Sequence, residues 1–288
     1  MDPHGVSMTT PRRGIAQTRQ GVRPHARPLD PYALYELCVT EPERVVRFIE
    51  AVHGGDPRVL REDFSGTGAL ARAWAASSAS RSAIAVDSDG APLARLQGAP
   101  RVRCIRARAE ACRRKADAVA ATNFPLGYFH DRAALVRYLR GVRASLSPGG
   151  VFVADMYGGA DAFTPMMLKR TRRGPGGERV EYTWEQREAD ALTGLVLDTL
   201  SFRVWPARRA AGARPTSPRV REFPDAFIYR WRLWSIPELR DAVRDAGFTT
   251  FDVYDELADA MDADGRVYVS PVSEGELDRN WVVYVVAR

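Results

Sequence analysis

Apolar and polar positions change their period in an orderly way along this 288-residue chain. In TEPERVVRFIEAVHGG, residues 40–55, Thr40 is a candidate N-cap and Gly54 follows the last apolar position. The apolar positions in between recur at helical spacing: Val45, Val46, Ile49 and Val52. The segments RVLRED and SAIAVD are short and apolar, whereas GALARAWAAS and APLARLQ have helical spacing. This order predicts a strand–helix–strand–helix unit.

The same alternation continues to residue 157 and resumes after residue 234. The expected strands are VRCIRA, ADAVAATN and VFVADMY, with the helix DRAALVRYLRGVRASL and an SPGG turn before the last of them. The helix IPELRDAVRDAGF and the strands TTFDVYDEL and NWVVYVVAR complete the pattern. Strands that alternate with helices predict an α/β fold with a doubly wound, mostly parallel sheet. Such sheets bind ligands beyond the carboxyl ends of their strands.

Residues 160–234 follow a different pattern. Tyr182 and Trp184 alternate with polar residues, and so do Phe227, Tyr229 and Trp231. A period of two is typical of half-buried antiparallel strands. We therefore expect one domain over residues 30–288, with an inserted antiparallel sheet in 160–234. Residues 1–29 are rich in Arg, Pro and Thr, lack an apolar centre, and predict a disordered tail rather than a secretory signal.

Composition narrows the choice of partners. The formal net charge is +6, and the N-terminal tail supplies four of these six charges, so the domain itself carries little excess positive charge. A nucleic-acid partner is not expected from so small an excess. The loop PARRAAGARPTSPRVR is read as a solvated flexible segment. No apolar run has the length of a membrane span, so no membrane partner is expected.

The cysteines give no sign of a disulfide framework or a metal site. They are three in number and widely separated: Cys38, Cys104 and Cys112. An odd, widely spaced set favours a reducing compartment, so we expect a cytoplasmic protein. We expect no metal ligands, and the oligomeric state cannot be read from the sequence.

The candidate chemistry begins at VLREDFSGTGALARAW, residues 59–74. Gly66 and Gly68 form a turn between a strand end and a helix start, where the backbone can approach a ligand closely. Asp87 lies 21 residues beyond Gly66, near the spacing at which a carboxylate binds ribose hydroxyls. These features alone also fit a nicotinamide dinucleotide.

The two carboxylates before the turn favour a different ligand. Glu62 and Asp63 would repel a diphosphate, but they suit a ligand that presents an ammonium or sulfonium group. S-adenosylmethionine is such a ligand, and its ribose would also lie beside Asp87.

These residues resemble the class I S-adenosylmethionine-dependent methyltransferases, whose first turn is an acidic residue followed by a glycine-rich loop. The resemblance covers roughly residues 30–288 and implies a seven-stranded, Rossmann-like sheet. LREDFSGTG is similar to a subgroup with Leu-Arg-Glu-Asp-Phe-Cys-Gly-Thr at this place, with Ser65 where that group has Cys. Phe64 departs from the general class, which has a glycine at this position.

The resemblance implies roles for individual residues. Glu62, with Asp63 beside it, would contact the methionine end of the cofactor, Asp87 the ribose, and Glu110 the adenine amino group. Tyr32 precedes the fold and would close over the cofactor. Asn123 and Phe124 in TNFPLGYF fall at the end of the fourth strand, where the methyl group and its acceptor meet in this fold.

Other candidates have simpler explanations. His130 precedes a predicted helix and is more typical of a surface or capping residue than of a base. Aromatic residues of the inserted sheet would suit a cage for a cation, but their alternation is typical of a packed face, so we expect core roles for most of them. They are Tyr182, Trp184, Phe202, Trp205, Tyr229, Trp231 and Trp234.

The sequence thus predicts a methyltransferase that acts on a small-molecule acceptor by in-line methyl transfer. The apolar, aromatic insertion favours the small acceptor. Two alternatives stay open at this point. One is an NAD(P)-dependent oxidoreductase, and the other is a non-catalytic module that binds S-adenosylmethionine, for which Phe64 in the loop would be the structural cue.

Overall fold

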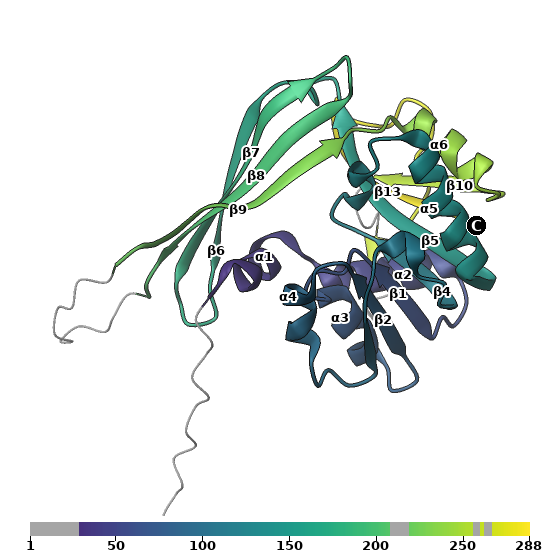
Figure 1. Cartoon of the computed structure of the whole chain (residues 1–288), viewed down its shortest axis with the longest axis horizontal. Helices are drawn as coiled ribbons and strands as arrows, with labels where there is room; N and C mark the ends of the chain where they lie inside the picture. The colour runs from purple at the N-terminus through teal and green to yellow at the C-terminus, as the bar shows by residue number, and fades with distance from the viewer. Residues whose placement is uncertain (1–28, 208–218, 256–259, 262–266) are drawn as a thin grey trace, which may run out of the picture.

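The computed structural model describes residues 29–207, 219–255, 260–261 and 267–288. Nearly all of the predicted tail and most of the Arg-rich loop lie outside these residues. Within these residues there are two main sheets and one two-stranded sheet, and Figure 1 shows the smaller main sheet extending away from the larger. None of the helices in the described residues combines the length and apolar character of a membrane span.

The larger sheet has seven strands in the order β10-β13-β5-β4-β1-β2-β3. Neighbours from β5 to β3 are parallel, whereas β13 is antiparallel to both β5 and β10. This confirms the predicted doubly wound, mostly parallel fold. The strand bounds are β1 Val59–Asp63, β2 Ser82–Asp87, β3 Val102–Arg106, β4 Ala116–Ala121, β5 Leu146–Gly159, β10 Phe251–Asp255 and β13 Asn280–Ala287.

Helices cover both faces of this sheet, because a strand buried on both sides must find apolar partners on each. On β4, Ala118 and Ala120 pack in the core under α2 (Pro42–His53) and α3 (Ala69–Ser77). Val119 and Ala121 point to the opposite core, under α5 (Arg132–Ser145) and α6 (Ile236–Asp245). The short helix α4 (Gly90–Leu93) continues into the 3-10 turn η1 (Ala94–Leu96), and two further 3-10 turns are η2 (Ala109–Ala111) and η3 (Pro125–Tyr128).

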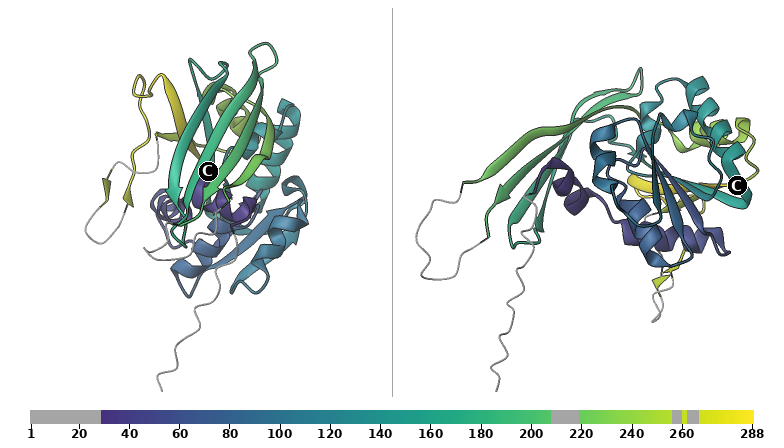
Figure 2. Two further views of the ribbon diagram at one scale, coloured as in Figure 1. Left: turned by 90° about the vertical axis from the view of Figure 1, so that its left-hand side faces the viewer. Right: turned by 60° about the horizontal axis from the view of Figure 1, so that its bottom comes forward.

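The smaller sheet is the predicted antiparallel insertion, with strands β6 (Met166–Arg173), β7 (Arg179–Asp190), β8 (Leu195–Trp205) and β9 (Arg221–Arg232) in sequence order. Helix α1 (Pro31–Val39) packs against it through Leu34 and Cys38, which meet Val180, Leu200 and other residues of the sheet. Figure 2 shows the sheet curving over α1. Strand β6 is exposed along its whole length and has no apolar alternation, so the sequence pattern did not reveal it.

Two local predictions need correction, and one small sheet was not predicted. Thr40 is not the N-cap of α2. It ends α1, where its hydroxyl donates to the Glu36 carbonyl at 3.0 Å, and Glu41 precedes α2 without a capping side chain. The SPGG segment lies within β5 and shifts its register with β4. A two-stranded sheet, β11 (Ala260–Met261) and β12 (Val267–Tyr268), lies between β10 and β13 in the sequence.

Candidate active site

A cavity of about 1460 Å³ lies between the carboxyl ends of the parallel strands, α1 and the inner face of the small sheet. The loops after β1, β2, β3 and β4 line it, together with the end of β5. Ligand pockets commonly measure roughly 300 to 1,000 Å³, so this cavity has room for two small molecules at once.

The loop after β1 turns in the left-handed region of backbone conformation. Phe64, Gly66 and Gly68 have φ angles of 57°, 53° and 65°. A Cβ atom at Gly68 would overlap the buried side chain of Leu96, whereas one at Gly66 would meet no atom within 4 Å. Gly68 therefore allows helix α3 to pack closely, and Gly66 leaves the backbone open to the cavity.

The two adjacent carboxylates of β1 point to opposite faces of the sheet, as successive strand residues must. Glu62 lines the cavity, and its carboxylate accepts a hydrogen bond from the Ala71 N–H at 2.8 Å, in the first turn of α3. Burial raises the pKa of Glu62 to about 8, against the lowering effect of that N–H and of Arg72.

Asp63 turns away from the cavity, which contradicts its predicted contact with the cofactor. Its carboxylate pairs with Arg61 at 2.9 Å and accepts from the Tyr138 hydroxyl at 3.0 Å. Arg61 and Asp63 side chains are both fully buried. Period-two alternation along the strand was the signal that separates the two carboxylates, since Leu60 and Glu62 share one face and Arg61 and Asp63 the other.

Of the other predicted cofactor residues, Tyr32, Gly66, Asp87 and Glu110 line the cavity, whereas Gly68 does not and packs against Leu96. Asp87 ends β2 and accepts from the Gly66 N–H at 2.7 Å and from the Asp89 N–H at 2.8 Å, so it holds the glycine loop in place. Glu110 lies on η2 and pairs with Arg108 at 2.8 Å. Tyr32, on α1, lines the same cavity. Burial first, and then the charges of Asp89 and Asp87, raise the pKa of its phenol.

Asn123 and Phe124 also line the cavity, in a second loop with left-handed backbone, at φ 68° and 64°. Their N–H groups donate to the two oxygens of Asp155, at 2.8 and 2.7 Å. The structure therefore brings both predicted acceptor-side residues to the cavity and shows a carboxylate behind them.

Asp155 is the site residue that sequence reasoning missed. It lies on β5, lines the cavity, and is 4% exposed. Burial raises its pKa to about 7, although the two N–H groups of Phe124 and Asn123 lower it. The available signal was a carboxylate within the apolar run VFVADMY. Burying a charge costs free energy, so a carboxylate in a buried strand indicates a specific partner or a ligand.

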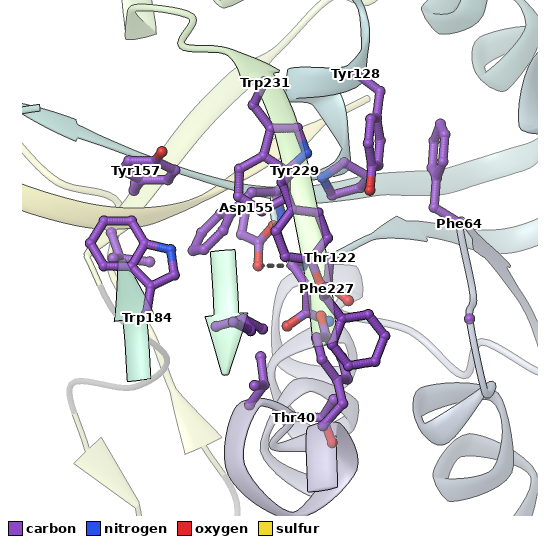
Figure 3. Close-up of a pocket in the computed structure, with 18 of the residues that line it drawn as sticks. Thr40, Phe64, Thr122, Tyr128, Asp155, Tyr157, Trp184, Phe227, Tyr229 and Trp231 are labelled. Carbon is purple, nitrogen blue, oxygen red and sulfur yellow. Dashed lines mark hydrogen bonds between the residues drawn. The ribbon is translucent and has the colours of Figure 1, made fainter. Parts of the chain in front are cut away.

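Aromatic side chains form the wall opposite the loops. Figure 3 shows Tyr157, Trp184, Phe227, Tyr229 and Trp231 around the carboxylate of Asp155. The rings of Tyr229 and Trp231 stack at 4.4 Å. The expectation of core roles for most of these aromatics is confirmed, since Tyr182, Phe202, Trp231 and Trp234 are buried. Four of the seven also line the cavity: Tyr182, Trp184, Tyr229 and Trp231.

A second buried carboxylate stands behind this wall. The Tyr157 hydroxyl donates to Asp198 at 2.7 Å, and the Asp198 side chain has no solvent exposure. Burial raises the pKa of Asp198 to about 6. His130, in contrast, does not line the cavity. It is exposed, and its Nε2 lies 2.9 Å from the Arg230 carbonyl.

No family model and no curated protein matches this sequence. Solved structures do share its fold. A S-adenosylmethionine-dependent methyltransferase from Clostridium acetobutylicum superposes with a TM-score of 0.64 at 16% identity, over 89% of this chain and 96% of that one. The amino pentose methyltransferase CalS10 from Micromonospora echinaspora gives 0.61 at 18% identity, over 89% and 95%.

The sugar N-methyltransferase KedS8 from a Streptoalloteichus species gives a TM-score of 0.60 at 18% identity, over 99% of this chain and 100% of that one. Coverage this complete includes the inserted sheet as well as the seven-stranded one. At these identities the likeness establishes the class I methyltransferase fold.

Proposed function

We propose that this protein transfers a methyl group from S-adenosylmethionine to a small-molecule acceptor bound in the same cavity. One observation carries the proposal: Glu62 occupies the N-terminal turn of α3 from the cavity side, with its carboxylate on the Ala71 N–H. A dinucleotide diphosphate needs the free N–H groups of such a turn. Here a carboxylate already takes one of them, and it favours a cationic ligand.

The remaining cofactor contacts follow from the positions of the side chains. Asp87 at the end of β2 would accept from the ribose hydroxyls through its remaining lone pairs. Glu110 would contact the adenine amino group, and Tyr32 would cover the cofactor from α1. Gly66 lets the backbone approach the ligand. Asp63 has no place in this set.

Methyl transfer from a sulfonium is an in-line displacement, so the protein contributes mainly alignment and the exclusion of water. The cavity would hold cofactor and acceptor side by side, and Asn123 and Phe124, which line it, would lie between the two. CalS10 and KedS8 act on an amino pentose and a sugar, which supports a small acceptor here.

Several finer assignments belong to the same proposal. We place the chain in the subgroup whose first motif reads Leu-Arg-Glu-Asp-Phe-Cys-Gly-Thr, with residues 30–288 as the catalytic domain and 160–234 as the acceptor-specific insertion. The free thiols of Cys38, Cys104 and Cys112 are consistent with a cytoplasmic location.

Mass spectrometry of the purified protein for retained cofactor, followed by thermal melting with S-adenosylhomocysteine and with NAD(P)H, tests the proposal. Bound ligand raises the melting temperature, so S-adenosylhomocysteine should raise it and the dinucleotides should not. Asp87→Ala should abolish the shift and Glu62→Gln should reduce it, whereas Asp190→Asn, in the exposed β7–β8 turn, should leave it unchanged.

The outcomes separate the alternatives. A melting shift with the dinucleotides alone means an oxidoreductase. Binding of S-adenosylhomocysteine without transfer of labelled methyl groups into any metabolite extract means a non-catalytic binding module.

A further inference from the structure

We propose that the methyl acceptor is an amine that binds as an ammonium against the aromatic wall, and that Asp155 is the catalytic residue that takes its proton. This inference rests on the proposed function, because it assigns the acceptor half of the same cavity.

The first argument is an uncompensated pair of carboxylates. Asp155 and Asp198 are 4% and 0% exposed, and among the described residues neither has a Lys, Arg or His partner within ion-pair distance. Asp63, equally buried, has Arg61 at 2.9 Å. A buried negative charge without a positive partner is costly, and a cationic ligand would supply the missing charge.

The second argument is the direction of the hydrogen bonds. Tyr157 gives its only hydroxyl proton to Asp198, so towards the cavity its oxygen can only accept. Asp155, when ionised, also only accepts. These two oxygens therefore favour an acceptor molecule that presents N–H or O–H donors to them.

The third argument separates an amine from an alcohol. Faces of Trp and Tyr rings attract cations within about 6 Å, and an ammonium gains from them while a neutral hydroxyl does not. Trp184, Tyr229 and Trp231 line the cavity on the same side as Tyr157. A wall of this kind beside the uncompensated carboxylate of Asp155, with Asp198 behind it, favours an ammonium over a neutral group.

The reaction balances without a further reagent. The Asp155 carboxylate takes one proton from the bound ammonium, and the freed nitrogen lone pair attacks the methyl carbon. The new C–N bond forms as the C–S bond breaks, and the C–S electron pair stays on sulfur to give neutral S-adenosylhomocysteine. The methylated amine leaves as an ammonium, and Asp155 then releases its proton to water.

The titratable groups in the cavity around Asp155 are phenols and carboxylates. They are Tyr35 from α1, Tyr284 from β13 and Glu62 from β1, with Tyr157 and Asp198 beside it. Burial raises the pKa of every one of these phenols above its ordinary value. A bound cationic cofactor would keep Glu62 ionised, which leaves Asp155 and Asp198 as the carboxylates whose raised pKa values, about 7 and about 6, lie near neutral pH. Substitution of Asp155 alone separates the two.

The test uses the full-length protein saturated with S-adenosylhomocysteine and two matched pairs of probes. Benzylamine and cyclohexylamine are compared with benzyl alcohol and cyclohexanol, and binding is measured by saturation-transfer NMR. We expect the amines to bind at least about tenfold more tightly than the alcohols. Their affinity should rise as the pH rises through about 7, while the probes remain cationic and Asp155 ionises.

Two variants and one control locate the effect. Asp155→Asn should weaken amine binding about tenfold or more and remove its pH dependence. Tyr157→Phe, which disturbs no backbone hydrogen bond, should weaken it as well. Asp190→Asn makes the same charge change in an exposed turn and should behave as the unmodified protein does.

Equal binding of alcohols and amines, binding of neither, or unchanged binding in both Asp155→Asn and Tyr157→Phe would overturn the inference. So would a loss of S-adenosylmethionine affinity in Asp155→Asn with S-adenosylhomocysteine affinity retained, because Asp155 would then serve the sulfonium. If the unmodified protein fails to bind S-adenosylhomocysteine at all, the proposed function fails instead.

Discussion

The loops after β1 and β4 have the same kind of backbone turn but are built from different residues. Each turns sharply in left-handed backbone, and each is held by a carboxylate from the neighbouring strand. Asp87 of β2 accepts from Gly66, and Asp155 of β5 accepts from Asn123 and Phe124. The first loop uses two glycines, whereas the second uses none at its left-handed positions.

The difference shows what each loop contributes to the cavity. Glycines remove side chains, so the first loop exposes backbone to a ligand. The second loop accepts the strain of left-handed Asn and Phe, on the order of 1 kcal/mol each, and thereby keeps the Phe124 ring against Tyr157 at 5.0 Å. The cofactor half of the cavity is thus shaped by backbone, and the acceptor half by side chains.

Removing the two carboxylates should produce the largest contrast. Asp155→Ala leaves two buried N–H groups without a partner, and we expect it to lower the free energy of unfolding by about 2 to 5 kcal/mol. Asp87→Ala should cost only about 1 kcal/mol, because Asp87 is half-exposed and water can replace it. Urea denaturation measures both, and equal losses would mean that the two loops are held in the same way.

Substitutions at the two glycines of the first loop should affect different properties, the stability of the fold at Gly68 and the affinity for the cofactor at Gly66. Gly68→Ala adds left-handed strain and an overlap with Leu96, so we expect a loss of about 2 kcal/mol in unfolding free energy. Gly66→Ala adds strain alone, about 1 kcal/mol, but its methyl group enters open space at the cavity. Its affinity for S-adenosylhomocysteine should fall about tenfold, as measured by calorimetry, whereas stronger destabilisation by Gly66→Ala would contradict the packing assigned to Gly68.

The contrast between the loops also explains what the sequence could predict. Short apolar runs predicted the strands of the main sheet, because both faces of that sheet are buried, and helical spacing predicted most of its helices. The glycine loop is recognisable from residues that are close together in the sequence. Glu62, Asp87 and Glu110 line the cavity as expected. The prediction for Asp63 was wrong because successive residues of a strand point to opposite faces, and Glu62 is the one that points into the cavity.

The acceptor half was harder to predict, because tertiary contacts decide it. Tyr182, Trp184, Tyr229 and Trp231 alternate like core residues, and the sequence does not tell which face of the inserted sheet will be covered by helix and which by a cavity. Asp155 acquires its surroundings from Asn123 and Phe124, more than thirty residues earlier in the chain. Spacing within a single segment carries no such information.

The pH dependence of cofactor binding should distinguish Glu62 from Asp155. The pKa of Glu62 is raised to about 8, which means that the folded protein favours the neutral carboxyl group. This contribution to stability is complete below the ordinary pKa of a glutamate side chain and is lost as the pH rises through 8. A cationic ligand favours the ionised form, so S-adenosylhomocysteine affinity should rise about tenfold between about pH 6 and pH 8. Calorimetry should show this slope lost in Glu62→Gln and retained in Asp155→Asn.

Phe64 offers the finest comparison, because it places a large side chain in left-handed backbone within the glycine loop. Its ring packs against those of Tyr128, Phe129 and Tyr138, with 5.7 to 6.1 Å between ring centroids. Both Phe64→Ala and Phe64→Gly should therefore destabilise the protein. Glycine alone releases the strain at φ 57°, so Phe64→Gly should be more stable than Phe64→Ala by about 1 kcal/mol, the reverse of their order in a helix. Urea denaturation of the two variants side by side measures the difference. If alanine is the more stable replacement, the left-handed turn at Phe64 is not the source of strain, and the first loop tolerates side chains as readily as the second.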